Sequence, residues 1–159
     1  MSRIRKFNPS DVAGAAAVLN STEPGDSSEG FREKSRKILE SVAGREGLYV
    51  GEENETIAGI VWFLAEPVFA DGGLVILLAV RPEMRRHGIG RQLLGFTERK
   101  IFSQSQSSFF SISSHNNPGL QFLGKMGYTR VSEIPPPVES GDAQWILRKT
   151  THERKNSRW

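Results

Sequence analysis

A run of seven consecutive apolar residues, 74–80, constrains the fold of this 159-residue chain more than any other feature of its sequence. The run is too short for a buried helix and fits a strand that is covered on both faces. Arg81-Pro82 ends the run, and apolar residues then recur at the spacing of a helix between Ile89 and Ile101. The chain therefore places a buried strand, a turn and an amphipathic helix in direct succession.

Further strands and helices are predicted on both sides of this segment. Apolar patterning predicts strands at 2–7, 48–51, 56–64, 107–113, 128–134 and 144–148. The strand at 56–64 is apolar on both faces, which indicates a central position. Helices are predicted at 9–20, 31–42 and 118–126, and the second would bury Phe31, Ile38, Leu39 and Val42. Loops are expected at 21–30, 52–55, 66–73 and 135–137.

Composition bounds the class of protein. With 37% hydrophobic residues, the chain can bury one core of ordinary size. We therefore expect a single domain over residues 1–147 and a basic, frayed tail over residues 148–159. The absence of cysteine excludes a disulfide framework, a thiolate metal site and a cysteine nucleophile. No metal cofactor is expected.

Patterning and charge also bear on location and partners. The longest dense apolar stretch, 57–64, is shorter than the roughly 20 residues that a membrane-spanning helix needs. The N-terminus lacks the apolar core of a signal peptide, so we expect a cytoplasmic protein with no membrane partner. A net charge of +3 and a pI near 9.4 give a mild bias toward anionic partners, without the charge typical of a dedicated nucleic-acid binder.

The segment between the buried strand and the following helix reads Arg85-Arg86-His87-Gly88-Ile89-Gly90-Arg91. Its two glycines let the backbone approach a ligand closely, and the first turn of the helix offers unpaired N–H groups at the positive end of its dipole. Three arginines around these amides suit a diphosphate. The simpler alternative is that the glycines only shape a turn and the arginines only coat the surface.

Two common phosphate-binding motifs do not fit this segment. A Walker loop needs a glycine, four residues and then Gly-Lys-Ser or Gly-Lys-Thr, and the chain has no such string. The dinucleotide fingerprint would need a third glycine three residues after Gly90, where the chain has Leu93. Neither class of nucleotide site is therefore predicted.

The same segment resembles the acetyl-coenzyme-A signature of the GNAT family of N-acetyltransferases. Residues 78–83, Leu-Ala-Val-Arg-Pro-Glu, precede a loop from Arg85 to Gly90 that is similar to the family pattern of Gln or Arg, two residues, Gly, one residue, and Gly or Ala. Farther along, Asn116 before a short helix and Gly127-Tyr128 after it also resemble the family. The resemblance covers nearly the whole chain up to Leu147.

This resemblance implies a mixed α/β (α+β) fold: a central, mostly antiparallel sheet of about seven strands, splayed in the middle and flanked by about four helices. It implies acetyl-CoA as co-substrate, with its diphosphate wrapped by the amides of 85–91 and its pantetheine arm bonded by the strand edge at 78–80. Asn116 would contact the cofactor from the other side, although it can equally be a helix N-cap. The implied cofactor-binding residues are Leu78, Ala79, Val80, Arg85, Arg86, His87, Gly88, Ile89, Gly90, Arg91 and Asn116.

The catalytic residues stay open at this point. Direct transfer needs a base for the amine, a donor for the developing oxyanion and a way for the thiolate to leave. A main-chain N–H near Val80 fits the second role. Leu123 stands where many family members have a Tyr that serves as the acid to the departing thiolate, and the strand at 74–80 carries no carboxylate. Glu66, Asp71 and His115 are candidate bases, each with a simpler structural reading.

The expected function is acetyl transfer from acetyl-CoA to a primary amine of a small molecule or peptide, by a monomer or homodimer. The acceptor pocket would be built from 21–30, the second helix, 66–73 and 134–141. Acidic side chains in these segments suit a cationic amine, or are acidic only because they are solvated; they are Glu23, Asp26, Glu29, Glu66, Asp71, Glu139 and Asp142. The alternative is a binding or regulatory module that keeps the cofactor site and has lost catalysis.

Overall fold

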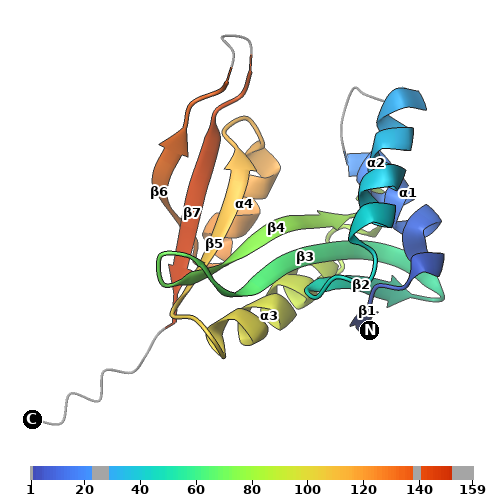
Figure 1. Cartoon of the computed structure of the whole chain (residues 1–159), viewed down its shortest axis with the longest axis horizontal. Helices are drawn as coiled ribbons and strands as arrows, with labels where there is room; N and C mark the ends of the chain where they lie inside the picture. The colour runs from blue at the N-terminus through green and yellow to red at the C-terminus, as the bar shows by residue number, and fades with distance from the viewer. Residues whose placement is uncertain (1, 23–28, 138–140, 152–159) are drawn as a thin grey trace, which may run out of the picture. The chain divides into compact units, whose positions relative to one another are not determined.

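The computed structural model of the chain describes residues 2–22, 29–137 and 141–151, which form seven strands and four α-helices (Figure 1). The strands are β1 (Arg3–Lys6), β2 (Leu48–Glu53), β3 (Thr56–Phe69), β4 (Gly72–Val80), β5 (Ser107–Ser113), β6 (Thr129–Ile134) and β7 (Gln144–Thr150). The helices are α1 (Val12–Thr22), α2 (Glu29–Val42), α3 (Ile89–Phe102) and α4 (Asn117–Lys125). Among these described helices, none combines the length and the hydropathy that crossing a bilayer requires.

The strands follow the order β1-β2-β3-β4-β5-β7-β6 in the sheet. The mixed α/β class and the predicted numbers of strands and helices are therefore confirmed, and β3 has a neighbour on each side as its two apolar faces indicated. The chain divides into two compact units, residues 1–64 with 75–99 and residues 65–74 with 100–159. The boundary crosses β3, β4 and α3, so these elements contribute to both units.

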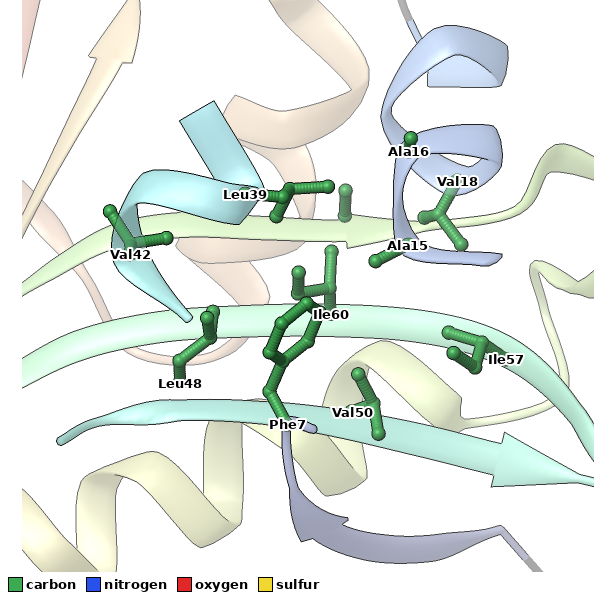
Figure 2. Close-up of a cluster of buried hydrophobic side chains, with 11 residues drawn as sticks. Phe7, Ala15, Ala16, Val18, Leu39, Val42, Leu48, Val50, Ile57 and Ile60 are labelled. Carbon is green, nitrogen blue, oxygen red and sulfur yellow. The ribbon is translucent and has the colours of Figure 1, made fainter. Parts of the chain in front are cut away.

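The core of the first unit lies between its strands and the helices α1 and α2, which share one face (Figure 1). β2 pairs antiparallel with β1 and with β3, so that Val50 lies opposite Ile60. Figure 2 shows Phe7, which follows β1, pointing into this cluster toward Ile60. Leu39 of α2 is 1% exposed. Because full burial of such a side chain stabilises by about 1.5–3 kcal/mol, this cluster holds α2 on the sheet.

Helix α3 packs on the opposite face of the first unit (Figure 1). A Cβ atom added at Gly59 of β3 would lie 2.8 Å from Leu93 Cδ1 and 3.0 Å from the carbonyl oxygen of Ala79. A Cβ added at Gly51 of β2 would lie 3.5 Å from Ile89 Cγ2. Only a residue without a side chain allows so close an approach at Gly59. The first turns of α3 are therefore held tightly against β2 and β3.

The second unit is built on β5, β7 and β6, which pair antiparallel, with Phe110 opposite Leu147. Helix α4 lies beside these strands and buries Leu123 (Figure 1). Tyr128, three residues beyond the end of α4, is also buried, and its hydroxyl lies 2.8 Å from that of Ser108 on β5. The core position expected for Tyr128 is confirmed.

The prediction of a loop at 66–73 is wrong, because these residues belong to a long hairpin. β3 continues to Phe69 and β4 starts at Gly72, so the turn consists of Ala70 and Asp71. Ala70 adopts a left-handed φ of +51° to close it. The polar Glu66 and the neighbouring proline indicated a loop, but the extent of a strand is decided by the strands available for pairing and not by local propensity alone.

Three smaller predictions also need correction. Of the loop expected at 21–30, residues 23–28 lie outside the described part of the chain, and the flanking residues are helical. Ile38 does not share the buried face of Leu39 and Val42 but is 45% exposed, while the side chain of Phe31 is not described. β7 continues to Thr150, so the first residues assigned to the basic tail lie in a strand, and 152–159 lie outside the described residues.

Candidate functional site

The candidate site begins where β4 ends, and Arg81 fixes this point to the neighbouring strand. The Arg81 main-chain N–H donates to the carbonyl oxygen of Ala58 at 2.8 Å, and its Nε donates to that of Ile57 at 2.7 Å. Both acceptors lie on β3, so the chain leaves the sheet in a defined direction. A short 3-10 helix (Pro82–Met84) follows.

The loop after this turn depends on two residues with left-handed backbone. Arg86 has a φ of +67° and Gly88 a φ of +80°. Glycine adopts this conformation without the steric cost that a Cβ brings. The carbonyl of Gly88 accepts the first hydrogen bond of α3, from the N–H of Gln92 at 3.0 Å. The N–H groups at 89–91 precede this first helical bond and have no carbonyl acceptor in the helix.

Charge gathers on the exposed side of the same turn. Arg85, Arg86 and Arg91 are exposed, and within the part of the chain that the structure describes no ion pair occupies them. Ile89 is buried and anchors the turn, which leaves Gly90 half-buried between the anchor and the surface. One exposed stretch of backbone therefore carries N–H donors without a helical acceptor and three guanidinium groups. Such a set of donors suits an anion.

These residues fit the diphosphate of a coenzyme. A Cβ atom placed at Gly88 would meet nothing within 4 Å, so the backbone of the turn is open to a ligand. The delocalised charge of a diphosphate needs several donors at once, and amides with guanidinium groups supply them. Exposed His87 lies in the same turn. The expected set from 85 to 91 is thus brought together on one turn.

The other expected cofactor residues have separate surroundings. Leu78, Ala79 and Val80 are the last three residues of β4. The carbonyl of Val80 accepts a hydrogen bond from Arg85 Nε at 3.2 Å. Asn116 belongs to the second unit, where its Oδ1 accepts from the N–H of Gly119 at 3.1 Å. Asn116 is therefore an N-cap of α4, and its contact with a cofactor stays a prediction.

The surroundings of Leu123, which stands where many family members have a Tyr, and of the candidate bases Asp71 and Glu66 differ from one another. Leu123, at the position of the family's Tyr, is 1% exposed and fills the core of the second unit. Asp71 sits in the turn between β3 and β4, with its carboxylate 3.6 Å from the guanidinium of Arg148. Glu66 lies exposed on the extension of β3.

His115 has a partner that the sequence did not reveal. Its Nδ1 lies 2.8 Å from Oδ1 of Asp142, a residue 27 positions later in the chain. Sequence patterning gave Asp142 only as one of several acidic loop residues. Such a pair has no fixed spacing, so only the folded chain can bring it out.

A groove of about 870 Å³ runs between α1 and α2 in the first unit. Small residues of α1 form one wall, and charged residues of α2 form the other. On that wall a hydrogen bond from Arg36 holds the pKa of the Glu33 carboxyl below its ordinary value, so Glu33 is anionic at neutral pH. The lining residues are Ala13, Ala16, Ala17, Asn20, Ser21, Gly30, Arg32, Glu33 and Arg36. Glu23, Asp26 and Glu139, expected near an acceptor, lie outside the described residues, as does the side chain of Glu29.

Comparison with known proteins gives one family match. The model of the acetyltransferase (GNAT) family matches residues 16–128 of the chain. This span includes β4, the arginine-rich turn, α3 and α4. No match is found among curated proteins.

Solved structures of similar fold cover almost the whole chain. A protein of Pyrococcus horikoshii is 15% identical with a TM-score of 0.78, covering 95% of this chain and 99% of that one. An acetyltransferase of the GNAT family from Bacillus cereus is 19% identical with a TM-score of 0.72, covering 94% and 97%. The PaiA N-acetyltransferase of Thermoplasma acidophilum, solved in complex with coenzyme A, is 20% identical with a TM-score of 0.72, covering 95% and 99%. At these identities the likeness shows a shared fold.

Proposed function

Since the chain belongs to the acetyltransferase (GNAT) family, we propose that it transfers the acetyl group of acetyl-CoA directly to a primary amine of a small molecule or peptide. The observation that carries this proposal is the turn at 85–91, where helix N–H groups without a helical acceptor share one exposed stretch of backbone with three arginines that form no ion pair among the described residues. A coenzyme with a diphosphate is the ligand that such a donor set suits best.

Each part of this turn has a role in the proposal. The amides at 88–91 and the guanidinium groups of Arg85, Arg86 and Arg91 hold the diphosphate. The backbone of 78–80 bonds the pantetheine arm, and Asn116 contacts the cofactor while it caps α4. The Val80 N–H donates to the oxyanion that develops at the thioester carbonyl, in a strand whose apolar surroundings strengthen the interaction.

The coenzyme thiolate needs little help to leave. A thiol has an ordinary pKa of about 8.5, so its anion is a tolerable leaving group near neutral pH. The buried Leu123 in place of a tyrosine therefore does not block transfer. The protein works in this proposal in the cytoplasm, as a monomer or homodimer, without a metal, membrane or nucleic-acid partner.

The acceptor is a cationic amine in this proposal. The groove between α1 and α2 carries Glu33, but this carboxylate is paired with Arg36 at 2.8 Å and Arg32 also lines the groove, so the groove itself does not favour a cation. Ser113 and His115 of the second unit bind Asp142, another carboxylate that can attract an ammonium group. Asp142 is therefore the feature that supports an alkylamine over an anionic acceptor.

A second candidate function is a module that binds acetyl-CoA and transfers nothing. The burial of Leu123 and the lack of a carboxylate on 74–80 favour it. Both candidates share the cofactor site, so binding alone does not separate them, whereas turnover does.

The binding step is tested by thermal and chemical unfolding with and without coenzyme A. At a hundred times its dissociation constant the ligand should add about 2.7 kcal/mol of stability. Gly90→Leu, which places a side chain beside the helix N–H groups, should remove most of this gain. Lys125→Gln, on an exposed position of α4, is the matched control and should keep it. Full protection of both variants would refute the diphosphate site.

The transfer step is tested by release of free coenzyme A thiol. The acceptors are 1,4-diaminobutane, spermidine, tyramine, lysine and a hexapeptide with a free N-terminus, each with acetyl-CoA. Release above hydrolysis with at least one amine, with the acetylated amine identified by mass spectrometry, supports the enzyme. Protection by acetyl-CoA without release for any amine supports the binding module instead.

A further inference from the structure

β6 is an edge strand whose outer side is open. It is the last strand in the order of the sheet, and it pairs on one side with β7 (Figure 1). Within the described residues no strand lies along its other side. All six residues of β6 are exposed, and the apolar Val131 and Ile134 are 50% and 53% exposed. Because such an edge offers unpaired N–H and C=O groups, another strand can be added to it.

A bulge in β6 brings two opposite charges to one face of the sheet. The register against β7 shifts between Arg130 and Ser132, so β6 carries one extra residue there. Arg130 lies opposite Leu147, and Glu133 lies opposite Trp145. Since Leu147 and Trp145 are two residues apart on β7, they share a face, and Arg130 and Glu133 share it with them. In a regular strand, residues three apart point to opposite faces.

The contacts of the two side chains agree with this register. Arg130 Nη2 and Glu133 Oε2 form an ion pair, and the Arg130 guanidinium lies 4.2 Å from the centre of the Trp145 ring. The two charged side chains are still 46% and 43% exposed. A strand added beside β6 can therefore reach both charges.

The charges of β6 are complementary to themselves in one arrangement. Apart from the bulged residue, the ladder positions of β6 are 129, 130, 132, 133 and 134, so Ser132 is the middle one. A second copy that pairs antiparallel about a two-fold axis through Ser132 places its Glu133 opposite Arg130, and its Arg130 opposite Glu133. Ile134 then lies opposite Thr129 of the second copy. Cross-strand pairs of opposite charge stabilise a sheet.

The same pattern disfavours other ways of pairing. A parallel copy in register would place Arg130 opposite Arg130 and Glu133 opposite Glu133, and like charges directly opposite each other destabilise a sheet. Bulges and charged side chains are common devices that protect an edge from unspecific pairing. In β6 these devices leave the two-fold arrangement as the one in which both charges face an opposite charge.

We propose that β6 is the interface of a homodimer, in which two copies pair antiparallel about Ser132 and Arg130 of each copy faces Glu133 of the other. All residues that carry this proposal lie in β6 and β7, so it does not depend on the acetyl transfer. A pair of six-residue strands is smaller than a standard protein interface, so we expect a dimer that dissociates on dilution.

The test is the dissociation constant of the dimer, measured by sedimentation equilibrium of the full chain up to millimolar concentration. Arg130→Glu and Glu133→Arg each turn both contacts between the copies into pairs of like charge. Lys125→Glu and Glu46→Arg are the matched controls, because they change the net charge by the same amounts at exposed positions outside β6. Thermal unfolding shows whether each variant is folded.

The expected result is loss of the dimer in each variant and its recovery in their mixture. Each charge reversal alone should raise the dissociation constant by about tenfold or more, because two favourable pairs become two unfavourable ones. The controls should dimerise like wild type. An equimolar mixture of Arg130→Glu and Glu133→Arg should also dimerise like wild type, since every Glu of one chain then faces an Arg of the other. The ion pair within each chain stays broken in this mixture, so the recovery reports only the contact between copies.

Three results would overturn the proposal. One is a wild-type chain that stays monomeric at every concentration. Another is a dimer whose dissociation constant neither reversal changes, which places the interface elsewhere. The third is a loss of the dimer in both variants that their mixture does not restore. If one variant does not fold, the other is compared with the double variant Arg130→Glu/Glu133→Arg, whose failure to dimerise like wild type overturns the proposal instead.

Discussion

Arg81 Nε donates to the main-chain carbonyl of Ile57 at 2.7 Å, so the residue that directly follows β4 is bound to the start of β3. The N–H of Arg81 bonds the next carbonyl, that of Ala58, at 2.8 Å. These two bonds lie four residues before the arginine-rich turn and define where the turn begins. Arg81 therefore shapes the cofactor site without being one of the proposed ligands.

Arg81→Ala should destabilise the protein and weaken cofactor binding together. It removes a hydrogen bond from a charged donor, which contributes about 1.5–3 kcal/mol, and it loosens the entry to the turn. Urea unfolding with and without coenzyme A measures both effects. Arg45→Ala, at an exposed position after α2, should change neither. A Kd for coenzyme A equal to wild type in Arg81→Ala would contradict this role.

Gly59→Ala tests the close packing of α3 on the sheet. The new Cβ would lie 2.8 Å from Leu93 Cδ1 and 3.0 Å from a backbone oxygen that cannot move freely. Overpacking of this kind costs about 1–3 kcal/mol, and the shift of α3 should also lower the affinity for coenzyme A.

Gly124→Ala is the matched control for this substitution. Gly124 lies in α4, and a Cβ there meets nothing within 4 Å. Alanine should stabilise the helix by about 0.4–1 kcal/mol, because the unfolded chain loses freedom. Equal unfolding free energies for the two alanine variants would show that α3 does not pack against Gly59 as described.

The contact between Arg5 and Asp11 predicts how stability depends on acid. Two hydrogen bonds, at 2.7 and 2.9 Å, join the Arg5 guanidinium to the Asp11 carboxylate, and they hold the pKa of Asp11 below its ordinary value. A lowered pKa in the folded state contributes stability above the unfolded value of about 3.9, and this contribution is lost as pH falls below it.

Asp11→Asn should therefore lower the free energy of unfolding at pH 7 by about 1.5–3 kcal/mol. It should also flatten the decline in stability below about pH 4. Urea unfolding between pH 2.5 and 7 measures both, with Glu46→Gln at an exposed position as the control. A wild-type slope in the acidic range for Asp11→Asn would show that Asp11 does not carry the effect.

The local parts of the site could be predicted from sequence, because they depend on neighbouring residues. The apolar run before Arg81, the glycine at position 88 and the spacing from Ile89 place the turn between strand and helix. The observed bounds of β5, Ser107–Ser113, match the prediction for the same reason. Short-range signals of this kind need no knowledge of the partner strands.

The rest depends on contacts that have no sequence spacing. The extension of β3 through Glu66 to Phe69 is set by pairing and overrides the loop signals of that segment. Ile38 falls just outside the buried stripe of α2, which the approximate helical period could not resolve. The approach of His115 to Asp142 joins positions 27 apart, and only the folded second unit produces it.

Substitutions at two glycines distinguish the backbone strain of the turn from its role in binding coenzyme A. Gly88 and Gly44 have φ values of +80° and +84°, and a Cβ at either position would meet nothing within 4 Å. Gly88→Leu and Gly44→Leu should therefore lose similar stability, about 1–2 kcal/mol, from left-handed backbone alone. Only Gly88→Leu covers the N–H groups that begin α3, so only this variant should lose the stabilisation by coenzyme A. Equal protection of both variants by the ligand would mean that the diphosphate binds elsewhere.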